Sequence, residues 1–212
     1  MIRGLGIVMG GLLVGACSVV GVRSGTEQPA YQVVDRLEGG VEIRRYAPRL
    51  AAETTVATAD GQAGRSQAFR RLADFIFGAN RAQAKVAMTA PVQLEAGPST
   101  IAMTAPVATQ ARDDSLTMRF FMPASYTPDT LPEPLDPAIR IVAVPEETLA
   151  VLRFSGSTGR AAVTAREAEL SRILAGSSWQ PQGEPVAQFY DPPWTLPFLR
   201  RNEVAVAVAG PG

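Results

Sequence analysis

Side chains able to carry chemistry are few in this sequence. Its 212 residues include no His and a single Cys, Cys17. These absences exclude a catalytic Ser-His-Asp or Cys-His unit, a His-ligated metal centre and an internal disulfide. Chemistry therefore falls to carboxylates, hydroxyls, Arg, Tyr, Met and Lys85, the only Lys. No spacing among the carboxylates identifies a catalytic pair, so the sequence does not predict an enzyme.

Met and Thr recur in a repeated hexapeptide. AMTAPV occurs at residues 87–92 and again at residues 102–107, with a turn-forming cluster between the copies. Both copies favour extended structure, and each contains a Pro that cannot donate a ladder hydrogen bond. We therefore expect residues 85–107 to form a hairpin with two similar arms. Met88 and Met103 then either pack against the preceding helix or offer thioether sulfurs to a metal.

The N-terminus is typical of a targeting segment. An apolar run over residues 5–16 is too short for a membrane span, which needs about 20 residues. It ends in LVGA directly before Cys17, which resembles the lipobox of bacterial lipoproteins. We expect residues 1–16 to be a signal peptide, Cys17 to be lipidated on the periplasmic face, and residues 17–30 to be a tether. Ser18 favours the outer membrane under bacterial sorting rules; a cleaved signal without lipid, or a retained anchor, is the alternative.

The rest of the chain reads as one α+β domain over residues 31–210. Hydrophobic residues make up 46% and charged residues 19%, which is ordinary for a globular protein, and the zero net charge does not indicate a nucleic-acid partner. Strand, strand, helix, strand, strand appears twice, in pseudo-repeats at about 31–122 and 139–209. The pattern predicts an open, distorted antiparallel β-barrel with two helices. The expected strands are 31–36, 41–46, 50–57, 116–122, 139–144, 149–154, 185–190 and 203–209, and the expected helices are 65–78, with Ser66 as N-cap, and 160–175.

Two segments could line a ligand cleft. The first helix carries an inward stripe that includes Phe69 and Leu72, and Phe75 widens its apolar surface. Residues 190–203 combine Tyr190, Trp194, several prolines and Arg200 in a rigid loop. Such a loop either walls a cleft or plugs one end of the barrel, and the helix aromatics either line a groove or pack under a strand.

Taken together, these segments resemble the SOUL haem-binding protein family, and the doubled AMTAPV resembles its bacterial branch. The resemblance covers nearly the whole chain after the tether. It implies an open β-barrel with two helices and an internal repeat. It also extends to effector-binding domains that hold small hydrophobic molecules. The segments that carry it are YQVVDRLEGGVEIRRYAP (31–48), FRRLADFIFGAN (69–80), KVAMTAPV (85–92), IAMTAPV (101–107), RFFMPASYTPDTLPEPLDP (119–137) and YDPPWTLPFLRRNEV (190–204).

The resemblance implies a tetrapyrrole such as haem as the ligand, held weakly in an apolar cleft by an envelope carrier or buffer. Because the chain has no His, an iron ligand would be Met, Tyr or Lys85; we favour binding without iron ligation, through apolar contacts and Arg–propionate pairs. The alternatives are a module for another small hydrophobic ligand and a structural envelope lipoprotein. The expected site residues are Phe69, Leu72, Phe75, Met88, Met103, Tyr190, Trp194 and Arg200.

Overall fold

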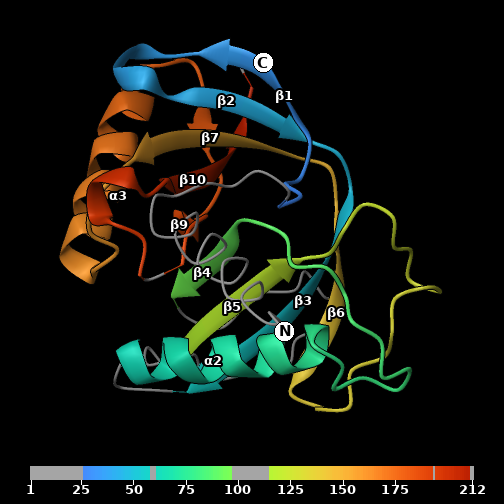
Figure 1. The fold of residues 1–212 in the computed structure, drawn as a ribbon. Helices are drawn as coiled ribbons and strands as arrows, with labels where there is room; N and C mark the ends of the chain where they lie inside the picture. The colour runs from blue at the N-terminus through green and yellow to red at the C-terminus, as the bar shows by residue number, and fades with distance from the viewer. Residues whose placement is uncertain (1–25, 58–60, 97–114, 193, 211–212) are drawn as a thin grey trace, which may run out of the picture.

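A computed structural model describes residues 26–57, 61–96, 115–192 and 194–210. In these residues ten antiparallel strands form one sheet in the order β1-β2-β7-β10-β9-β4-β5-β3-β6, with β8 pairing to β10. The sheet curls into an open half-barrel with two helices on its outer face (Figure 1). The predicted fold class is therefore confirmed. The elements are β1 Tyr31–Arg36, β2 Glu42–Tyr46, β3 Arg49–Ala57, α2 Gly61–Ile76, β4 Val92–Ala96, β5 Ser115–Phe121, β6 Ile139–Val144, β7 Glu147–Phe154, α3 Arg160–Ala175, β8 Gln180–Pro181, β9 Val186–Phe189 and β10 Asn202–Ala209, with short 3-10 turns η1 Glu38–Gly40 and η2 Pro197–Leu199.

The strand order has an internal twofold pattern. Read from one side, after the edge strand β1, it runs β2-β7-β10-β9, and read from the other side it runs β6-β3-β5-β4. The strands β2, β3, β4 and β5 therefore correspond to β6, β7, β9 and β10, with the pseudo-axis between β4 and β9. Each half gives its first strand to the other half, because β2 pairs with β7 and β3 pairs with β6. The predicted repeat is present, and this exchange of strands joins its halves into one sheet.

Both helices cover apolar side chains of the sheet. Side chains alternate between the faces of a strand, so the outer-face residues of β5 are Leu116, Met118 and Phe120. They pack with Leu72 and Phe75 of α2 in one core cluster. A second cluster joins α3 to β7 and β10. Full burial of each such Leu or Phe stabilises the fold by roughly 1.5–3 kcal/mol, so these clusters fix the helices on the sheet.

The first helix is longer at its start than the sequence predicted. It begins at Gly61, so Ser66, the expected N-cap, lies inside it. It ends at Ile76, and Gly78 follows with a φ of +121°, a conformation that favours glycine, so the predicted stop is confirmed.

The first AMTAPV copy is not the strand that the sequence predicted. Residues 87–91 precede β4, and they are held by contacts outside the strand ladder. The Thr89 hydroxyl donates to the Phe121 carbonyl oxygen, and the Ala90 N–H donates to the Glu27 carbonyl oxygen at 2.9 Å. The following strand, β4, is flanked by β5 and β9. The second copy, with Met103, lies outside the described residues.

The N-terminal end of the described chain packs against the body. Glu27 forms a parallel bridge with Thr89, and Arg201 donates to the Gln28 side-chain oxygen at 3.1 Å. The last residues of the expected tether thus belong to the folded body. The expected signal peptide and Cys17 lie outside the described residues. Within the described part, neither helix has the length and apolarity that crossing a membrane requires.

Candidate functional site

The outer face carries exposed aromatic side chains beside buried ones. Phe69 of α2 is 41% exposed, and its ring meets Phe120 edge-on with centroids 5.4 Å apart. Leu72 and Phe75, one turn or more further along, are fully buried in the core. Only Phe69 of the three expected helix residues is therefore positioned to touch a ligand at the surface.

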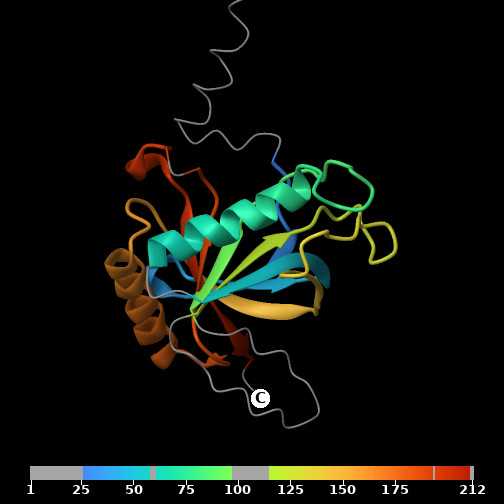
Figure 2. The ribbon, with the colours of Figure 1, turned by 90° about the horizontal axis from the view of Figure 1, so that it is seen from below.

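A chain of contacts brings the loop between β9 and β10 to the same side as α2. Arg65, one turn before Phe69, donates to the Thr158 carbonyl oxygen at 3.1 Å. The N–H of Gly156, two residues earlier, donates to the Pro197 carbonyl oxygen of the loop at 2.8 Å. Figure 2 shows this loop, in red, on the same side of the strands as α2. The two segments expected to line a cleft are therefore linked through residues 156–158.

The loop itself presents large apolar groups to solvent. Trp194 is 62% exposed and Phe198 is 70% exposed, and Leu196 and Leu199 are also exposed. The Arg200 Nε donates to the Thr195 carbonyl oxygen at 2.8 Å, which braces the loop from inside. We call the exposed residues Phe69, Trp194, Leu196, Phe198 and Leu199 the aromatic face.

The sheet supplies a floor between the two parts of the aromatic face. Phe120, Val92 and Phe189 are direct neighbours across β5, β4 and β9, so they share the outer face. Phe120 lies under Phe69, and Phe189 directly precedes the loop. Two strand spacings of about 4.8 Å separate Phe120 from Phe189, so helix and loop border a strip of sheet about 10 Å wide.

The candidate iron ligands are unequally available. Met118 and Met122 are buried in the core, whereas Met88 and Lys85 are exposed. Burial raises the pKa of Tyr190 far above its ordinary range, and Glu203 reinforces the effect. The pKa of Tyr46 is raised by burial as well. Neither phenol ionises near neutral pH, so neither fits the role of a phenolate ligand.

Tyr190 lies on the inner face of the sheet, away from the other expected residues. Its hydroxyl donates to Glu203 Oε2 at 2.6 Å, and the Arg201 guanidinium stacks on its ring with the carbon 3.9 Å from the centroid. Glu203 is fully buried and also accepts from Arg44 Nη1 at 3.0 Å and Arg201 Nη2 at 2.8 Å. Glu42 lies at the edge of this network. Burial raises the pKa of its carboxyl, but Arg44 and Arg36 outweigh burial and hold that pKa below its ordinary value.

A second buried carboxylate lies farther along the same inner face. Glu53 of β3 is buried and accepts from Arg119 Nε at 2.5 Å and from Arg140 Nη2 at 2.6 Å. Arg119 also approaches Glu95 at 3.4 Å, but burial dominates and raises the pKa of the Glu95 carboxyl. The inner face thus carries paired charges beside a small apolar cluster of Tyr46, Leu149, Val151 and Ala205.

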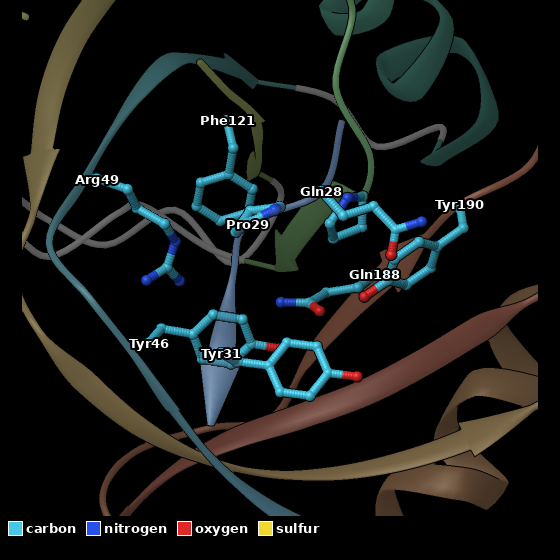
Figure 3. A pocket seen from close by; sticks show the side chains of 9 residues that line it. Gln28, Pro29, Tyr31, Tyr46, Arg49, Phe121, Gln188 and Tyr190 are labelled. Atoms are coloured by element: carbon cyan, nitrogen blue, oxygen red, sulfur yellow. The ribbon is translucent and has the colours of Figure 1, made fainter. Parts of the chain in front are cut away.

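A narrow pocket opens on the same inner face (Figure 3). The rings of Tyr46 and Phe121 lie 4.7 and 4.6 Å from the Arg49 guanidinium carbon, and Gln188 and Tyr190 form the opposite wall. The sequence reading missed these inner-face groups. The available signal was a charged residue next to an apolar one in an expected strand, as at Ile43-Arg44, Ala52-Glu53 and Glu203-Val204.

Among the described residues, no group of three or more Asp, Glu, Cys or His side chains could hold a metal ion.

The architecture defines a two-helix, half-barrel α+β protein. The sequence profile of the SOUL heme-binding protein family matches residues 26–207. The chain therefore belongs to the SOUL heme-binding protein family, and the predicted resemblance is confirmed. The family is one of binding proteins.

Curated relatives are distant. The chain is 26% identical to Heme-binding protein 2 of Mus musculus over 145 residues, which cover 65% of this chain and 66% of that protein. It is 29% identical to Heme-binding protein 2 of Homo sapiens over 118 residues, covering 56% and 53%. The matched regions thus span less than two thirds of either relative.

Solved structures share the fold at low identity. The EcmrR C-terminal domain superposes with a TM-score of 0.58 at 9% identity, covering 85% of this chain and 98% of that one. An uncharacterized conserved protein from Listeria innocua gives 0.55 at 11%, covering 88% and 94%. A hydrolase from the same organism gives 0.53 at 11%, with the same coverages. At these identities the likeness concerns the fold alone.

Proposed function

We propose that this protein binds haem or a related tetrapyrrole on its outer face, without a His ligand, and acts as a carrier or buffer. The observation that carries the proposal is the aromatic face, in a chain that belongs to a heme-binding family. Exposed rings on both a helix and a loop, with apolar strands between them, suit a large flat ligand.

The residues present fit a tetrapyrrole in part. Phe69 from α2 and Trp194 and Phe198 from the loop would contact its faces, and Arg65 and Arg200 would pair with its carboxylates. Bound haem would supply the iron chemistry. Among the described residues, Met88 has an exposed thioether. Because Met is a weak iron ligand, we expect apolar contacts to contribute most of the binding energy.

Haemin titration of the full chain tests the proposal. We expect a shifted Soret band with affinity in the micromolar range or weaker. Phe69→Ala and Trp194→Ala should each weaken binding about five-fold, equivalent to about 1 kcal/mol. The matched control is Phe77→Ala, which removes another exposed phenyl ring just beyond the far end of α2. A Soret band unchanged from haemin mixed with an unrelated protein, or an equal loss in Phe77→Ala, would contradict the proposal.

The binding mode has its own test. If iron is not ligated, Met88→Ala leaves the haemin spectrum unchanged. Loss of a six-coordinate spectrum in a folded Met88→Ala protein would show that a thioether holds the iron, while leaving tetrapyrrole binding intact.

We also propose that the protein is held in the bacterial envelope by a lipid on Cys17, at the periplasmic face of the outer membrane. The lipobox-like LVGA-Cys17 sequence supports this location. Mass spectrometry of the mature protein should find an acylated N-terminal Cys, and Cys17→Ser should release the protein from the membrane fraction. An unmodified Cys17 in membrane-bound protein would refute it.

A further inference from the structure

We propose that the inner-face pocket is a second binding site, for a small uncharged group that both accepts and donates a hydrogen bond, as an amide does. The pocket lies on the opposite face of the sheet from the aromatic face. Successive residues Phe120 and Phe121 mark this separation, since Phe120 packs with α2 and Phe121 lines the pocket. The site therefore stands independently of tetrapyrrole binding.

Two buried polar atoms at the pocket lack a partner among the described residues. The Arg49 side chain is only 10% exposed, yet its Nε–H has no acceptor. Gln188 is 2% exposed, and its Oε1 has no donor. Figure 3 shows both side chains directed into the space between the rings. An unsatisfied buried group costs roughly 1–3 kcal/mol, so a ligand that pairs with both atoms recovers that cost.

The other atoms of these side chains are already engaged, which defines the ligand's charge. Arg49 Nη2 donates to Glu147, so its positive charge is balanced. Gln188 Nε2 donates to Gln93 Oε1 at 3.5 Å, so the amide offers its oxygen. A carboxylate ligand would satisfy Arg49 but would face Glu147 and could not donate to Gln188. A carbonyl oxygen with a neighbouring N–H satisfies both.

The pocket's size restricts the group that enters it. The space open to the centre of a water-sized sphere is about 10 Å³, room for about one water-sized group, so only the polar end of a ligand enters the pocket. The flanking Tyr46 and Phe121 rings suit a planar group.

A wider groove of about 140 Å³ adjoins the pocket through Phe121. Glu147 and Gln93, the partners of Arg49 and Gln188, line this groove. Glu95, Glu147 and Glu184 face a single Arg there, which disfavours an anionic ligand body.

Acetamide is the probe, and acetate is its comparator, because the two have the same number of heavy atoms but acetate is charged and has no donor. Nitrogen–proton correlation spectra of the full chain should show acetamide shifting the Arg49 Nε–H and Gln188 side-chain signals, with millimolar affinity. Acetate should bind at least five-fold more weakly. Arg49→Lys keeps the charge beside Glu147 but loses the Nε–H, so it should weaken acetamide binding at least five-fold.

The matched control is Arg140→Lys, on the same inner face beside Glu53, which should change acetamide affinity less than two-fold. Equal binding of acetamide and acetate, or equal binding to wild-type and Arg49→Lys protein, overturns the proposal. So does a crystal structure soaked in acetamide that holds a water molecule only between Arg49 and Gln188. If Arg49→Lys does not fold, the wild-type comparison of acetamide with acetate decides alone.

Discussion

The two faces of the same sheet bury different kinds of side chain. The outer face is covered by helices and buries hydrocarbon, as at Phe75 among Leu72, Met118 and Phe120. Neither described helix covers the inner face, which buries ions beside a small apolar cluster, with Glu203 between Arg44 and Arg201 and Glu53 between Arg119 and Arg140. An apolar core tolerates loss of a contact in proportion to the volume removed, whereas an ion cluster fails when one charge is left alone.

The comparison also bears on function. The outer face is apolar to its rim, where Phe69, Trp194 and Phe198 remain in solvent. On the inner face the buried carboxylates Glu53 and Glu203 are paired with Arg side chains, whereas Arg49 Nε and Gln188 Oε1 have no partner among the described residues. The outer face therefore suits a large apolar ligand, and the inner face suits a small polar one.

Truncation in the outer core should give the largest effect. Phe75→Ala should lower the free energy of unfolding by about 4 kcal/mol, because it empties a fully buried site. Phe69→Ala on the same helix should cost about 1 kcal/mol or less, because its ring is partly in solvent. Urea unfolding of both variants measures the contrast. Similar losses would show that the aromatic face belongs to the core.

Neutralising the inner-face carboxylate should come next. Glu203→Gln leaves Arg44 and Arg201 without their shared counter-charge in a buried site, so we expect a loss of about 3 kcal/mol in the free energy of unfolding. Glu169→Gln, which breaks the exposed pair with Arg166, should cost about 0.5 kcal/mol or less. If the two substitutions prove equally mild, the inner network does not behave as a buried one.

Alkaline pH should weaken the inner face alone. The raised pKa values of Tyr190 and Tyr46 mean that the unfolded chain releases their protons first, near pH 10. Stability is thus fully present below about pH 10 and falls above it, by up to about 1.4 kcal/mol per pH unit for each tyrosine. Unfolding curves between about pH 9 and about pH 11 should show the fall, and Tyr190→Phe should reduce its slope. A slope that Tyr190→Phe leaves unchanged would assign the effect elsewhere.

Salt should produce the smallest effect and separate buried from exposed pairs. Between about 0.1 M and 1 M salt the screening length falls from about 10 Å to about 3 Å. The contribution of the exposed Arg166–Glu169 pair, about 0.5 kcal/mol, should disappear in a double-mutant cycle. The Arg44–Glu203 coupling should persist, since both side chains are almost fully buried. Equal screening of the two pairs would place the inner network in contact with solvent.

Local pattern was enough for both helices, most of the strands and much of the outer face. The apolar stripe of α2 follows helical spacing, so Leu72 and Ile76 could be placed in the core, and the repeated order of elements indicated two matching halves. Trp194 could be suspected as a ligand contact because the prolines around it resist regular structure, whereas Phe198 was not singled out.

Helix periodicity could not separate Phe69 from Phe75, because both are aromatic residues on one amphipathic helix. Burial depends on how the sheet meets that helix. The sequence also grouped Tyr190 with these residues, although its side chain lies on the inner face and donates to Glu203.

By itself the sequence determined both helices, most of the strands, the absence of His chemistry and the family's motifs, since each depends on composition or on neighbours along the chain. Tertiary structure alone decided which strands pair. The exchange of β2 and β6 between halves joins residues about a hundred positions apart, as in Glu42 opposite Val151. Register then set every second residue of those strands on the inner face. That placement brought Arg44 to Glu203, and Arg49 to Gln188 across the pocket, because side chains in a sheet alternate and pairing chooses their neighbours.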